Sequence, residues 1–303
     1  MTARILDGKA LSEEVLNSIR KEVASLSVKP CVAFVRVGDL PASATYVKRK
    51  QEAAASVGIE SRLELLPASS TQAEIIAVIS KLSRDEGVHG ILVQSPLPEG
   101  INPQDVFNSV PSHKDVDGFS AANLGRLAQG DETAFVACTP LGVQTLLRHY
   151  HISTEGKHVV VVGRSMIVGR PLSLLLSCKE GLNATVTSCN KETENLPQLC
   201  RSADIIIVAA GCPGLIRKDW VKKGATVIDV GINRIADATK KNGYRIVGDV
   251  DFAEVVKVAG AITPVPGGVG PMTVASLMAN TVKAARLSQI VKRADSPRVK
   301  VRA

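Results

Sequence analysis

The stretch that decides the fold reads His158-Val-Val-Val-Val-Gly-Arg-Ser-Met-Ile-Val-Gly-Arg-Pro171. Its run of valines indicates a buried strand, and Gly163 and Gly169 frame the turn that leads into a helix. In a doubly wound sheet, a strand followed by a glycine turn and a helix binds a pyrophosphate at the N-terminus of that helix. The common G-x-G-x-x-G pattern is altered, because Ser165 replaces the second glycine and Gly169 lies one position later. The context predicts a nucleotide site that includes Gly163, Arg164 and Ser165.

Strand and helix patterns alternate on both sides of this stretch. After it, strands are expected at residues 184–189, 204–209, 226–230 and 246–247. Before it, strands are expected at residues 31–37, 61–66 and 90–94, and helices at 12–26, 43–57, 73–82 and 139–150. Short continuous runs of β-branched residues between helices are typical of parallel sheets covered on both faces. We therefore predict an α/β protein with two α/β domains, the second a Rossmann-like doubly wound parallel sheet.

The domain boundaries are predicted from two helices. The helix near residues 139–150 is expected to connect the domains, and a long helix at about 272–287 is expected to return the chain to the first. The expected division is residues 1–138 plus 272–303 for one domain and 139–271 for the other, with a cleft between them.

Composition limits the classes of function. The 303 residues are 45% hydrophobic and 22% charged, which is enough apolar sequence for sizeable cores. The net charge of +8 favours anionic partners such as nucleotide phosphates. Aromatic residues make up only 3%, so stacking platforms for nucleic-acid bases are scarce and no nucleic-acid partner is expected.

Cysteine and histidine usage predicts the compartment and the absence of a metal site. The six cysteines are scattered without a C-x-x-C pair, which favours a reduced intracellular compartment. Cys31, Cys189 and Cys200 lie within or beside apolar runs and are expected to be buried thiols. The histidines show no metal-ligand spacing. With neither a membrane-length apolar run nor a signal peptide, we expect a cytoplasmic protein with no membrane partner, and a mitochondrial location stays open.

The residue after the second strand of the nucleotide domain bears on the cofactor. An NAD site places an acidic residue there for the ribose 2′-hydroxyl, but this strand runs into Asn190 and Lys191. Lys191 suits a 2′-phosphate, as does Arg164, and NADP is therefore the predicted cofactor. Two alternatives stay open, because Glu192 is close by and Lys191 could be a solvated surface lysine.

A second set of candidate residues lies on the helix at 43–57. Tyr46 and Lys50 are four residues apart and share one helix face, where they could form a proton-handling pair. The cationic neighbours Lys48 and Arg49 favour the neutral form of the Lys50 amine. Because Tyr-x-x-x-Lys is also a common helical pattern, a structural role is the alternative.

Polar residues also follow the strand at 90–94. Gln94 ends that strand, at the sheet edge where α/β proteins bind ligands. Further along, Lys114-Asp-Val-Asp-Gly118 places two carboxylates in a turn. A carboxylate can accept two N–H groups from an aminopyrimidine ring, although Asp115 or Asp117 could instead stabilise the turn itself.

The last candidate segment is Thr263-Pro-Val-Pro-Gly-Gly-Val-Gly-Pro-Met-Thr273. Its prolines and glycines predict a shaped loop that a ligand can approach closely, although a plain structural turn is the alternative. The helix expected from Met272 would offer free N–H groups to an anion or to a polar ring edge.

With these segments assembled, the chain resembles the bifunctional methylenetetrahydrofolate dehydrogenase/methenyltetrahydrofolate cyclohydrolase family. The matching segments occur in family order and span nearly the whole chain. They are Ser43-Ala-Thr-Tyr-Val-Lys-Arg-Lys50, Val93-Gln-Ser-Pro-Leu-Pro98, Lys114-Asp-Val-Asp-Gly118, Gly163-Arg-Ser-Met-Ile-Val-Gly169, Gly248-Asp-Val250 and the 263–273 loop.

The resemblance implies NADP-dependent oxidation of 5,10-methylenetetrahydrofolate to the methenyl form, followed by hydrolysis to 10-formyltetrahydrofolate. It implies that Lys50 is the catalytic lysine, that Tyr46 lies beside it against the folate, and that Gln94 hydrogen-bonds Lys50. It further implies that Asp117 binds the pterin and that Ile232 contacts the cofactor. The other implied substrate contacts are Val93, Ser95, Pro264, Gly267, Gly268 and Pro271. The family is also typically a homodimer joined through its nucleotide domains.

The chain departs from the family pattern at two positions, and three rival classes of protein are disfavoured. Ser95 stands where the family usually has leucine, and Lys191 stands where many members have serine.

A short-chain dehydrogenase is disfavoured, because its Tyr-x-x-x-Lys pair follows the nucleotide turn, whereas Tyr46 precedes Gly163. A non-catalytic nucleotide or nucleic-acid binder is opposed by the scarce aromatics. A dehydrogenase without the hydrolase step is opposed by Lys50 and Gln94.

Overall fold

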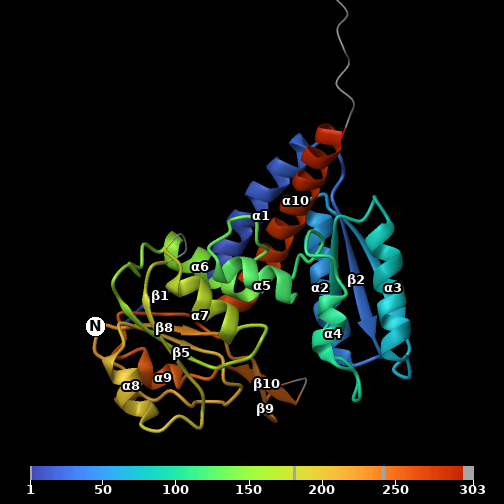
Figure 1. Cartoon of the computed structure of the whole chain (residues 1–303). Helices are drawn as coiled ribbons and strands as arrows, with labels where there is room; N and C mark the ends of the chain where they lie inside the picture. The colour runs from blue at the N-terminus through green and yellow to red at the C-terminus, as the bar shows by residue number, and fades with distance from the viewer. Residues whose placement is uncertain (1, 180–181, 241–242, 296–303) are drawn as a thin grey trace, which may run out of the picture. The chain divides into compact units, whose positions relative to one another are not determined.

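The computed structural model describes residues 2–179, 182–240 and 243–295, with side chains up to residue 290 (Figure 1). Its contacts divide the chain into two compact units. Unit 1 comprises Met1–Glu14 and Asn123–Ser276, and unit 2 comprises Val15–Ala122 and Leu277–Ala303. Three helices continue across these boundaries: α1 (Gly8–Ser25), α5 (Ala121–Ala128) and α10 (Val269–Asp295).

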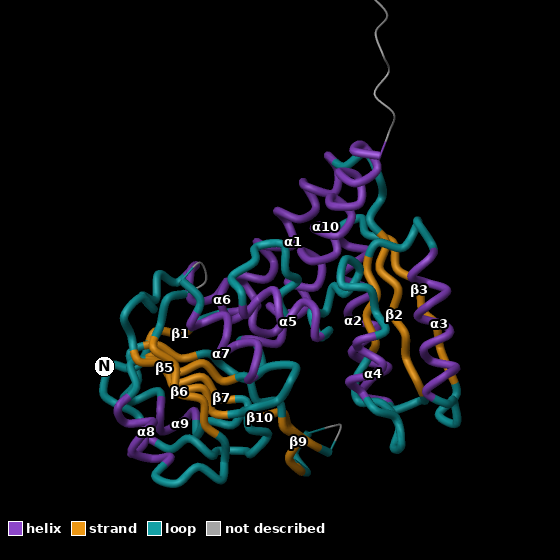
Figure 2. Tube along the Cα trace, in the orientation of Figure 1, coloured by secondary structure: helices purple, strands orange, loops and turns teal. Residues whose placement is uncertain are grey.

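Unit 1 is built on a six-stranded parallel sheet (Figure 2). In spatial order its strands are β1 (Arg4–Ile5), β11 (Ala261–Ile262), β8 (Thr226–Asp229), β7 (Ile205–Val208), β5 (His158–Val162) and β6 (Thr185–Cys189). Helix α7 (Gly169–Ser177) packs on β5 and β6, and α8 (Leu196–Ser202) packs on β5. The remaining helical segments of the unit are α6 (Cys138–His149), η1 (Lys218–Trp220) and α9 (Phe252–Val255).

The strand order locates the ligand-binding edge of this sheet. Strand β6 lies on one side of β5 and β7 lies on the other, so the chain winds in both directions from β5. In open α/β sheets, ligands bind outside the carboxyl ends of the strands at such a switch point. The prediction of a doubly wound parallel sheet is confirmed, and its switch point lies between β5 and β7.

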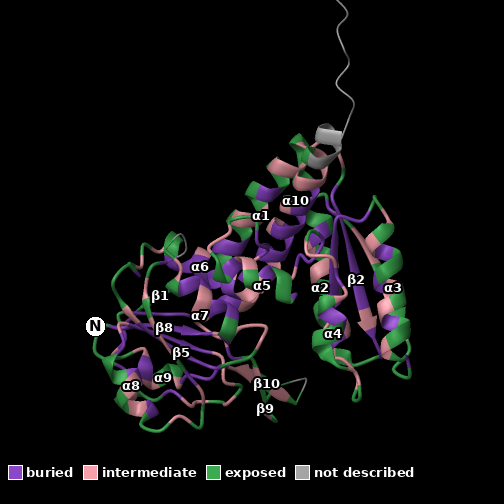
Figure 3. Cartoon of the chain, viewed as in Figure 1, coloured by how far each residue is buried: buried purple, intermediate pink, exposed green. Residues whose placement is uncertain are grey.

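One predicted strand belongs elsewhere. Residues 246–247 were expected in the parallel series, but they end β10 (Tyr244–Val247), which pairs antiparallel with β9 (Asn233–Ala236). This hairpin is a separate two-stranded sheet. Burial explains the difference, since β10 is only half-buried whereas the central strands of the main sheet are buried throughout (Figure 3).

Unit 2 contains a smaller parallel sheet of three strands. Its order is β3 (Glu60–Leu66), β2 (Cys31–Val37) and β4 (Gly90–Val93). Helix α2 (Pro41–Ser56) packs on β2 and β3, while α3 (Gln72–Arg84) packs on β4 and on α4 (Pro103–Asn108). The predicted α/β character of both parts of the chain is therefore confirmed.

The observed division differs from the predicted domain boundaries in three places, one of which is that residues 272–276 of α10 belong to unit 1. The N-terminal segment was assigned to the first domain with residues 1–138, but β1 pairs with β11 in the sheet of unit 1. Residues 123–138 also belong to unit 1, because Leu127 and Ala134 pack on Leu175 of α7. Both segments are too short to show a periodic pattern of their own, so only their packing partners reveal where they belong.

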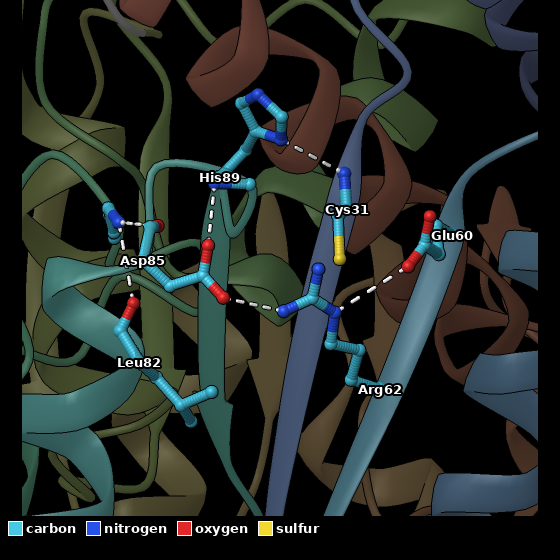
Figure 4. A network of polar contacts seen from close by, with 8 residues as sticks. Cys31, Glu60, Arg62, Leu82, Asp85 and His89 are labelled. Carbon is cyan, nitrogen blue, oxygen red and sulfur yellow. Dashed lines mark hydrogen bonds and ion pairs between the residues drawn. The ribbon is translucent and has the colours of Figure 1, made fainter.

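At the amino ends of the unit 2 strands, polar side chains bind one another (Figure 4). The Arg62 guanidinium contacts the Asp85 carboxylate at 2.7 Å and Glu60 at 3.5 Å. The Gly87 N–H and the Arg62 guanidinium hold the pKa of Asp85 below its usual range. The buried Lys114 ammonium donates to the Asp85 carbonyl at 2.7 Å. These contacts give Lys114, the first residue of one family segment, a structural role.

The three cysteines that follow or join apolar runs lie where the sequence predicted. Cys31, Cys189 and Cys200 are buried as predicted. Burial raises the pKa of Cys200 to about 12, so this thiol stays protonated at neutral pH. The Cys31 backbone N–H donates to Nδ1 of His89 at 3.1 Å, which ties the amino end of β2 to the start of β4 (Figure 4).

Candidate active site

Lys50 and Gln94 meet at the carboxyl edge of the unit 2 sheet. Lys50 lies on α2, and Gln94 is the first residue after β4. The Lys50 amine donates to Oε1 of Gln94 at 3.0 Å, and Nε2 of Gln94 donates to the Ser95 carbonyl at 2.6 Å. Because Nε2 is bound to a carbonyl, the amide oxygen must face the lysine. The Gln94 backbone N–H also donates to Val35 of β2, so both ends of this residue are held.

Tyr46 lies one helical turn before Lys50 and is 37% exposed. The buried Val47 anchors α2 between them. Lys48 is directed to solvent, since its side chain is 78% exposed and contacts Glu52 at 4.0 Å. The arrangement therefore gives Lys50 the Gln94 amide as its close partner, whereas Lys48 contacts Glu52.

The two carboxylates of the 114–118 segment have different surroundings. Asp115 is 3% exposed, and its carboxylate accepts the backbone N–H groups of Gly118 at 3.0 Å, Phe119 at 3.2 Å and Ser120 at 2.9 Å. Asp115 therefore stabilises the turn, which was the alternative interpretation of this pair. Asp117 lies at the same turn and is half-buried. The turn lies beside β4, because Asp115 forms a parallel bridge with Ile91.

In unit 1, the nucleotide turn requires its glycines. Gly163 has a φ of +136°, and a Cβ there would lie 2.3 Å from the Ala209 carbonyl oxygen. A Cβ on Gly169 would lie 1.9 Å from the Gly163 carbonyl oxygen. The bare backbone of this turn is the close-approach surface that a pyrophosphate needs. The turn thus has the geometry that the sequence predicted, in spite of its altered glycine spacing.

The two polar residues of the nucleotide turn, Ser165 and Arg164, differ in their contacts. The Ser165 hydroxyl accepts the N–H of Val168 at 3.1 Å and of Gly169 at 3.4 Å, so it caps the start of α7. Arg164 is exposed at the mouth of the turn. Both residues lie in the predicted turn between Gly163 and Gly169, and Ser165 also stabilises the start of α7.

Lys191 follows β6 and is 66% exposed. Its ammonium contacts the Glu192 carboxylate at 3.5 Å, and Glu192 is 73% exposed. An exposed pair of this kind is worth little. The geometry leaves Arg164 as the more direct candidate for the 2′-phosphate, because Lys191 has an adjacent acidic partner.

The glycine- and proline-rich loop has a defined backbone conformation, as the sequence predicted. Gly267 has a φ of +108°, and its carbonyl accepts the Lys9 N–H at 2.8 Å. A Cβ on Gly268 would lie 2.6 Å from the Pro264 carbonyl oxygen. Helix α10 begins at Val269, three residues before the predicted start. The remaining predicted substrate residue of this loop, Pro271, therefore lies in the first turn of the helix and is half-buried.

Other predicted residues are placed as follows. Val93 ends β4 and is buried, while Ser95 is half-buried after Gln94. Ile232 follows β8 and is 49% exposed.

Two buried aspartates at the carboxyl edge of the unit 1 sheet were not predicted. Asp229 ends β8 and Asp249 lies in the Gly248-Asp-Val250 segment. Burial raises the pKa of Asp229 to about 6, while backbone N–H donors from Asp249, Val250 and Gly231 act in the opposite direction. The family segment at 248–250 was the available signal for Asp249, but its partners lie far away in the sequence.

The described residues offer neither a metal cluster nor a membrane span. No three His, Cys, Asp or Glu side chains gather in those ranges as a metal site would require. No helix in the described part of the chain is long and apolar enough to cross a membrane.

The fold and these turns define a class of α/β enzymes with an NAD(P)-binding Rossmann-like domain. A model described as the tetrahydrofolate dehydrogenase/cyclohydrolase NAD(P)-binding domain matches residues 137–289, and one described as the catalytic domain matches residues 6–117. The chain belongs to the tetrahydrofolate dehydrogenase/cyclohydrolase family, and the resemblance predicted from its six segments is confirmed.

Individual relatives agree over nearly the full length. The bifunctional methylenetetrahydrofolate dehydrogenase/cyclohydrolase of Drosophila melanogaster, a mitochondrial protein, is 51% identical over 295 residues, covering 94% of this chain and 95% of that protein. The crystal structure of the bifunctional FolD enzyme from Campylobacter jejuni is 49% identical with a TM-score of 0.89, covering 94% of this chain and 99% of the other. The Trypanosoma brucei enzyme, crystallised with NADP and an inhibitor, is 38% identical with a TM-score of 0.90, covering 95% and 99%.

Proposed function

We propose a specific role for each unit in the two reactions of this family. The protein is a methylenetetrahydrofolate dehydrogenase and methenyltetrahydrofolate cyclohydrolase of one-carbon metabolism, and its cofactor is NADP. Unit 2 supplies the proton-transfer group and the folate contacts outside the 263–273 loop, and unit 1 binds NADP. The observation that carries this assignment is the hydrogen bond between Lys50 and Gln94 at the carboxyl edge of the unit 2 sheet.

Asp117 is proposed to bind the folate. Asp117 is half-buried and lies on a turn whose backbone the Asp115 carboxylate holds in place. A carboxylate accepts two N–H groups, which matches the donor-rich edge of an aminopyrimidine ring. Tyr46 would add ring contact and Val93 and Ser95 would line the same edge of the sheet.

Lys50 is proposed as the base of the hydrolysis. Hydrolysis adds one water across the cationic methenyl carbon: the water oxygen bonds to that carbon, and a neutral amine takes a proton from the water. The hydroxyl group of this adduct then loses its proton as its oxygen becomes the formyl C=O, one ring C–N bond breaks, and the released ring nitrogen takes up a proton, which leaves the formyl group on the other nitrogen. Gln94 orients the amine by accepting one of its N–H groups at 3.0 Å, which directs the lone pair elsewhere.

Unit 1 fits the dinucleotide. Close backbone contacts at Gly163 and Gly169 leave no room for a side chain at either position, and the exposed Arg164 lies beside Gly163 in the same turn. When bound, NADP supplies the two-electron oxidant for the methylene carbon. Arg164 would hold the 2′-phosphate with Lys191 as a weaker contact, and Gly163, Ser165 and Ile232 would contact the rest of the cofactor. Within the 263–273 loop, contacts to the substrate are proposed for Pro264, Gly267, Gly268 and Pro271.

A spectroscopic assay tests the function directly. Purified protein is given methylenetetrahydrofolate with NADP or NAD, and the formation of reduced cofactor and of the methenyl product is followed. Methenyltetrahydrofolate supplied alone should then disappear faster than it does in buffer. Absence of NADP reduction would contradict the dehydrogenase assignment, and methenyl decay at the buffer rate would reduce the protein to a dehydrogenase alone.

Two further proposals concern the assembly and the location of the protein, and the first of them rests on the family resemblance. The protein is expected to be a homodimer joined through its nucleotide units, and light scattering should give twice the mass of one chain. A cytoplasmic location is proposed, although one relative is a mitochondrial protein. Fractionation of the source cells, with the activity assayed in each fraction, distinguishes the two compartments.

A further inference from the structure

Two buried aspartates join three loops at the carboxyl edge of the unit 1 sheet. Asp229 ends β8 and is 3% exposed, and Asp249 follows β10 and is 0% exposed. The two are linked directly, because the Asp249 backbone N–H donates to Oδ1 of Asp229 at 3.0 Å. Neither carboxylate reaches the surface, so neither can touch a ligand.

The Asp229 carboxylate holds the segment that contains Asp249. Its Oδ1 also accepts the Gly231 N–H at 2.9 Å, and its Oδ2 accepts the Val250 N–H at 2.9 Å. The Asp229 backbone N–H in turn donates to the Thr263 hydroxyl at 2.7 Å. Asp229 thereby connects the ends of β8 and β11 to residues 249–250.

The Asp249 carboxylate holds the loop after β7. Its Oδ2 accepts the N–H groups of Ala210 at 2.7 Å and Gly211 at 2.9 Å. Its Oδ1 accepts the Cys212 N–H at 2.9 Å and the Asn233 side-chain amide at 2.7 Å. Three consecutive backbone groups of one loop are therefore bound to a single side chain that lies behind the loop.

Close packing makes this arrangement specific. A Cβ on Gly248 would lie 1.9 Å from Oδ2 of Asp229, and a Cβ on Gly231 would lie 2.4 Å from Cγ of Asp249. Glycine at both positions lets the backbone reach the carboxylates. This explains the glycine and aspartate of the Gly248-Asp-Val250 segment, to which the catalytic assignments give no role.

The loop held by Asp249 lies at the switch point of the sheet. It follows β7, which is the neighbour of β5, and Gly163 of the nucleotide turn packs against the Ala209 carbonyl. Asn233, the other Asp249 partner, follows Ile232, the exposed residue proposed to contact the cofactor. Asp249 therefore binds the backbone of the loop after β7 and the side chain of Asn233 after β8, and both segments lie on the β7 side of the crevice where a doubly wound sheet binds its nucleotide.

We propose that Asp249, supported by Asp229, is a positioning residue for NADP. It sets the position of the loop at 209–212 and of Ile232, while making no contact with NADP or folate. This inference rests on the proposed function, because it assumes that the crevice binds NADP. It assigns no part in hydrolysis to Asp249, since the groups proposed for that step are on unit 2.

The test compares Asp249→Asn with the matched control Asp204→Asn. Asp204 belongs to the same unit and also accepts a backbone N–H, that of His158 at 3.1 Å, but it lies at the amino ends of β5 and β7. Asp249→Asn keeps the shape of the side chain but replaces an acceptor with a donor that faces N–H groups. Asn233→Ala removes one of the four partners and serves as a milder variant that should fold if Asp249→Asn does not.

Four quantities are measured for each variant. Asp249→Asn should raise the dissociation constant for NADP, measured by calorimetry, and the KM for NADP by roughly 10- to 100-fold, as expected for a misplaced binding surface. The rate of hydrolysis of supplied methenyltetrahydrofolate should stay within about threefold of wild type, because the groups proposed for that step are on unit 2. Amide exchange across residues 209–212 should accelerate in the free protein. Asn233→Ala should shift NADP binding in the same direction by a smaller factor, and Asp204→Asn should leave it unchanged.

The outcomes separate this proposal from the proposed function. Wild-type protein that does not bind NADP would refute the function itself, irrespective of Asp249. If Asp249→Asn binds NADP like wild type, the positioning role is refuted. It is also refuted if Asp249→Asn and Asp204→Asn weaken NADP binding equally, because the effect would then reflect general loss of stability. Should Asp249→Asn fail to fold, unchanged NADP binding in Asn233→Ala would refute it.

Discussion

The two units place their polar groups in opposite ways at the same kind of sheet edge. In unit 2, Lys50 and Asp117 are half-buried and Tyr46 is 37% exposed, so these residues are partly accessible to solvent. In unit 1, Asp229 and Asp249 are buried behind loops whose backbone forms the edge. Unit 2 therefore presents polar side chains at its sheet edge, whereas unit 1 uses buried side chains to hold the backbone of its edge loops in place.

This difference predicts two kinds of mutant. Replacing an exposed reactive group should remove chemistry with little loss of stability. Replacing a buried carboxylate that binds backbone N–H groups leaves those donors unsatisfied, which costs about 1–3 kcal/mol. The largest effects are therefore expected on reaction rates when residues of unit 2 are replaced. The smallest are expected on the free energy of unfolding when the buried carboxylates of unit 1 are replaced.

Lys50→Met should give the largest loss. The methionine keeps the length and apolar stem of the side chain but removes the amine, and loss of a general base costs roughly 10²–10⁴-fold in rate. Hydrolysis of supplied methenyltetrahydrofolate should therefore nearly disappear, while hydride transfer, which depends on ring placement, should fall less. Lys48→Met is the matched control on the same helix, because Lys48 is directed to solvent. A near wild-type hydrolysis rate in Lys50→Met would place the base elsewhere.

Asp117→Ala and Asp115→Ala should separate ligand binding from stability within one turn. Asp117→Ala should weaken folate binding by about 2–5 kcal/mol, as for loss of one partner of a buried hydrogen-bonded charge, and lower both activities. Asp115→Ala should instead lower the free energy of unfolding, because three backbone N–H groups lose their acceptor. Folate titration and urea unfolding measure the two effects. Normal folate affinity in Asp117→Ala would show that Asp117 only stabilises the turn.

Arg164→Ala should distinguish the two cofactors. A charge-assisted contact is worth about 1.5–3 kcal/mol, so binding of NADP should weaken about ten- to a hundredfold while binding of NAD changes little. Lys191→Ala should have a smaller effect, because Lys191 is exposed and contacts Glu192. Steady-state kinetics with both cofactors provide the measurement. Equal losses for NADP and NAD would remove Arg164 from the 2′-phosphate.

The pH dependence of stability should report the buried pair in unit 1. The pKa of Asp229 is raised to about 6 from an ordinary value of 3.8, chiefly by burial, so between these values the folded protein binds the proton more tightly than the unfolded chain does. The stabilisation from this group is therefore complete below about pH 4 and is lost as pH rises through about 6, and each tenfold difference in proton affinity between the two states contributes about 1.4 kcal/mol. Urea unfolding of wild type and of Asp229→Asn, which cannot titrate, should diverge across this window. A constant difference between them would mean that Asp229 is ionised throughout.

Local sequence was sufficient for the main elements of the fold. The valine run before Gly163, the glycines of the turn and the β-branched strands all act over a few residues, so their pattern predicts a parallel sheet with a nucleotide turn. The pair Lys50 and Gln94 was predicted from a helix face and a strand end together with the family resemblance, and the structure brings the two within 3.0 Å. The roles of the individual site residues remain predictions.

The sequence by itself determined the α/β architecture, the family and the segments from which the site is built. Only the tertiary structure decided that β1 joins the unit 1 sheet, that Asp115 stabilises its turn, and that Asp249 binds a loop 37–39 residues earlier in the chain. The physical reason is range. Periodicity and turn preferences arise between near neighbours. A two-residue strand or a buried carboxylate takes its role from partners that folding brings to it, and no local pattern records them.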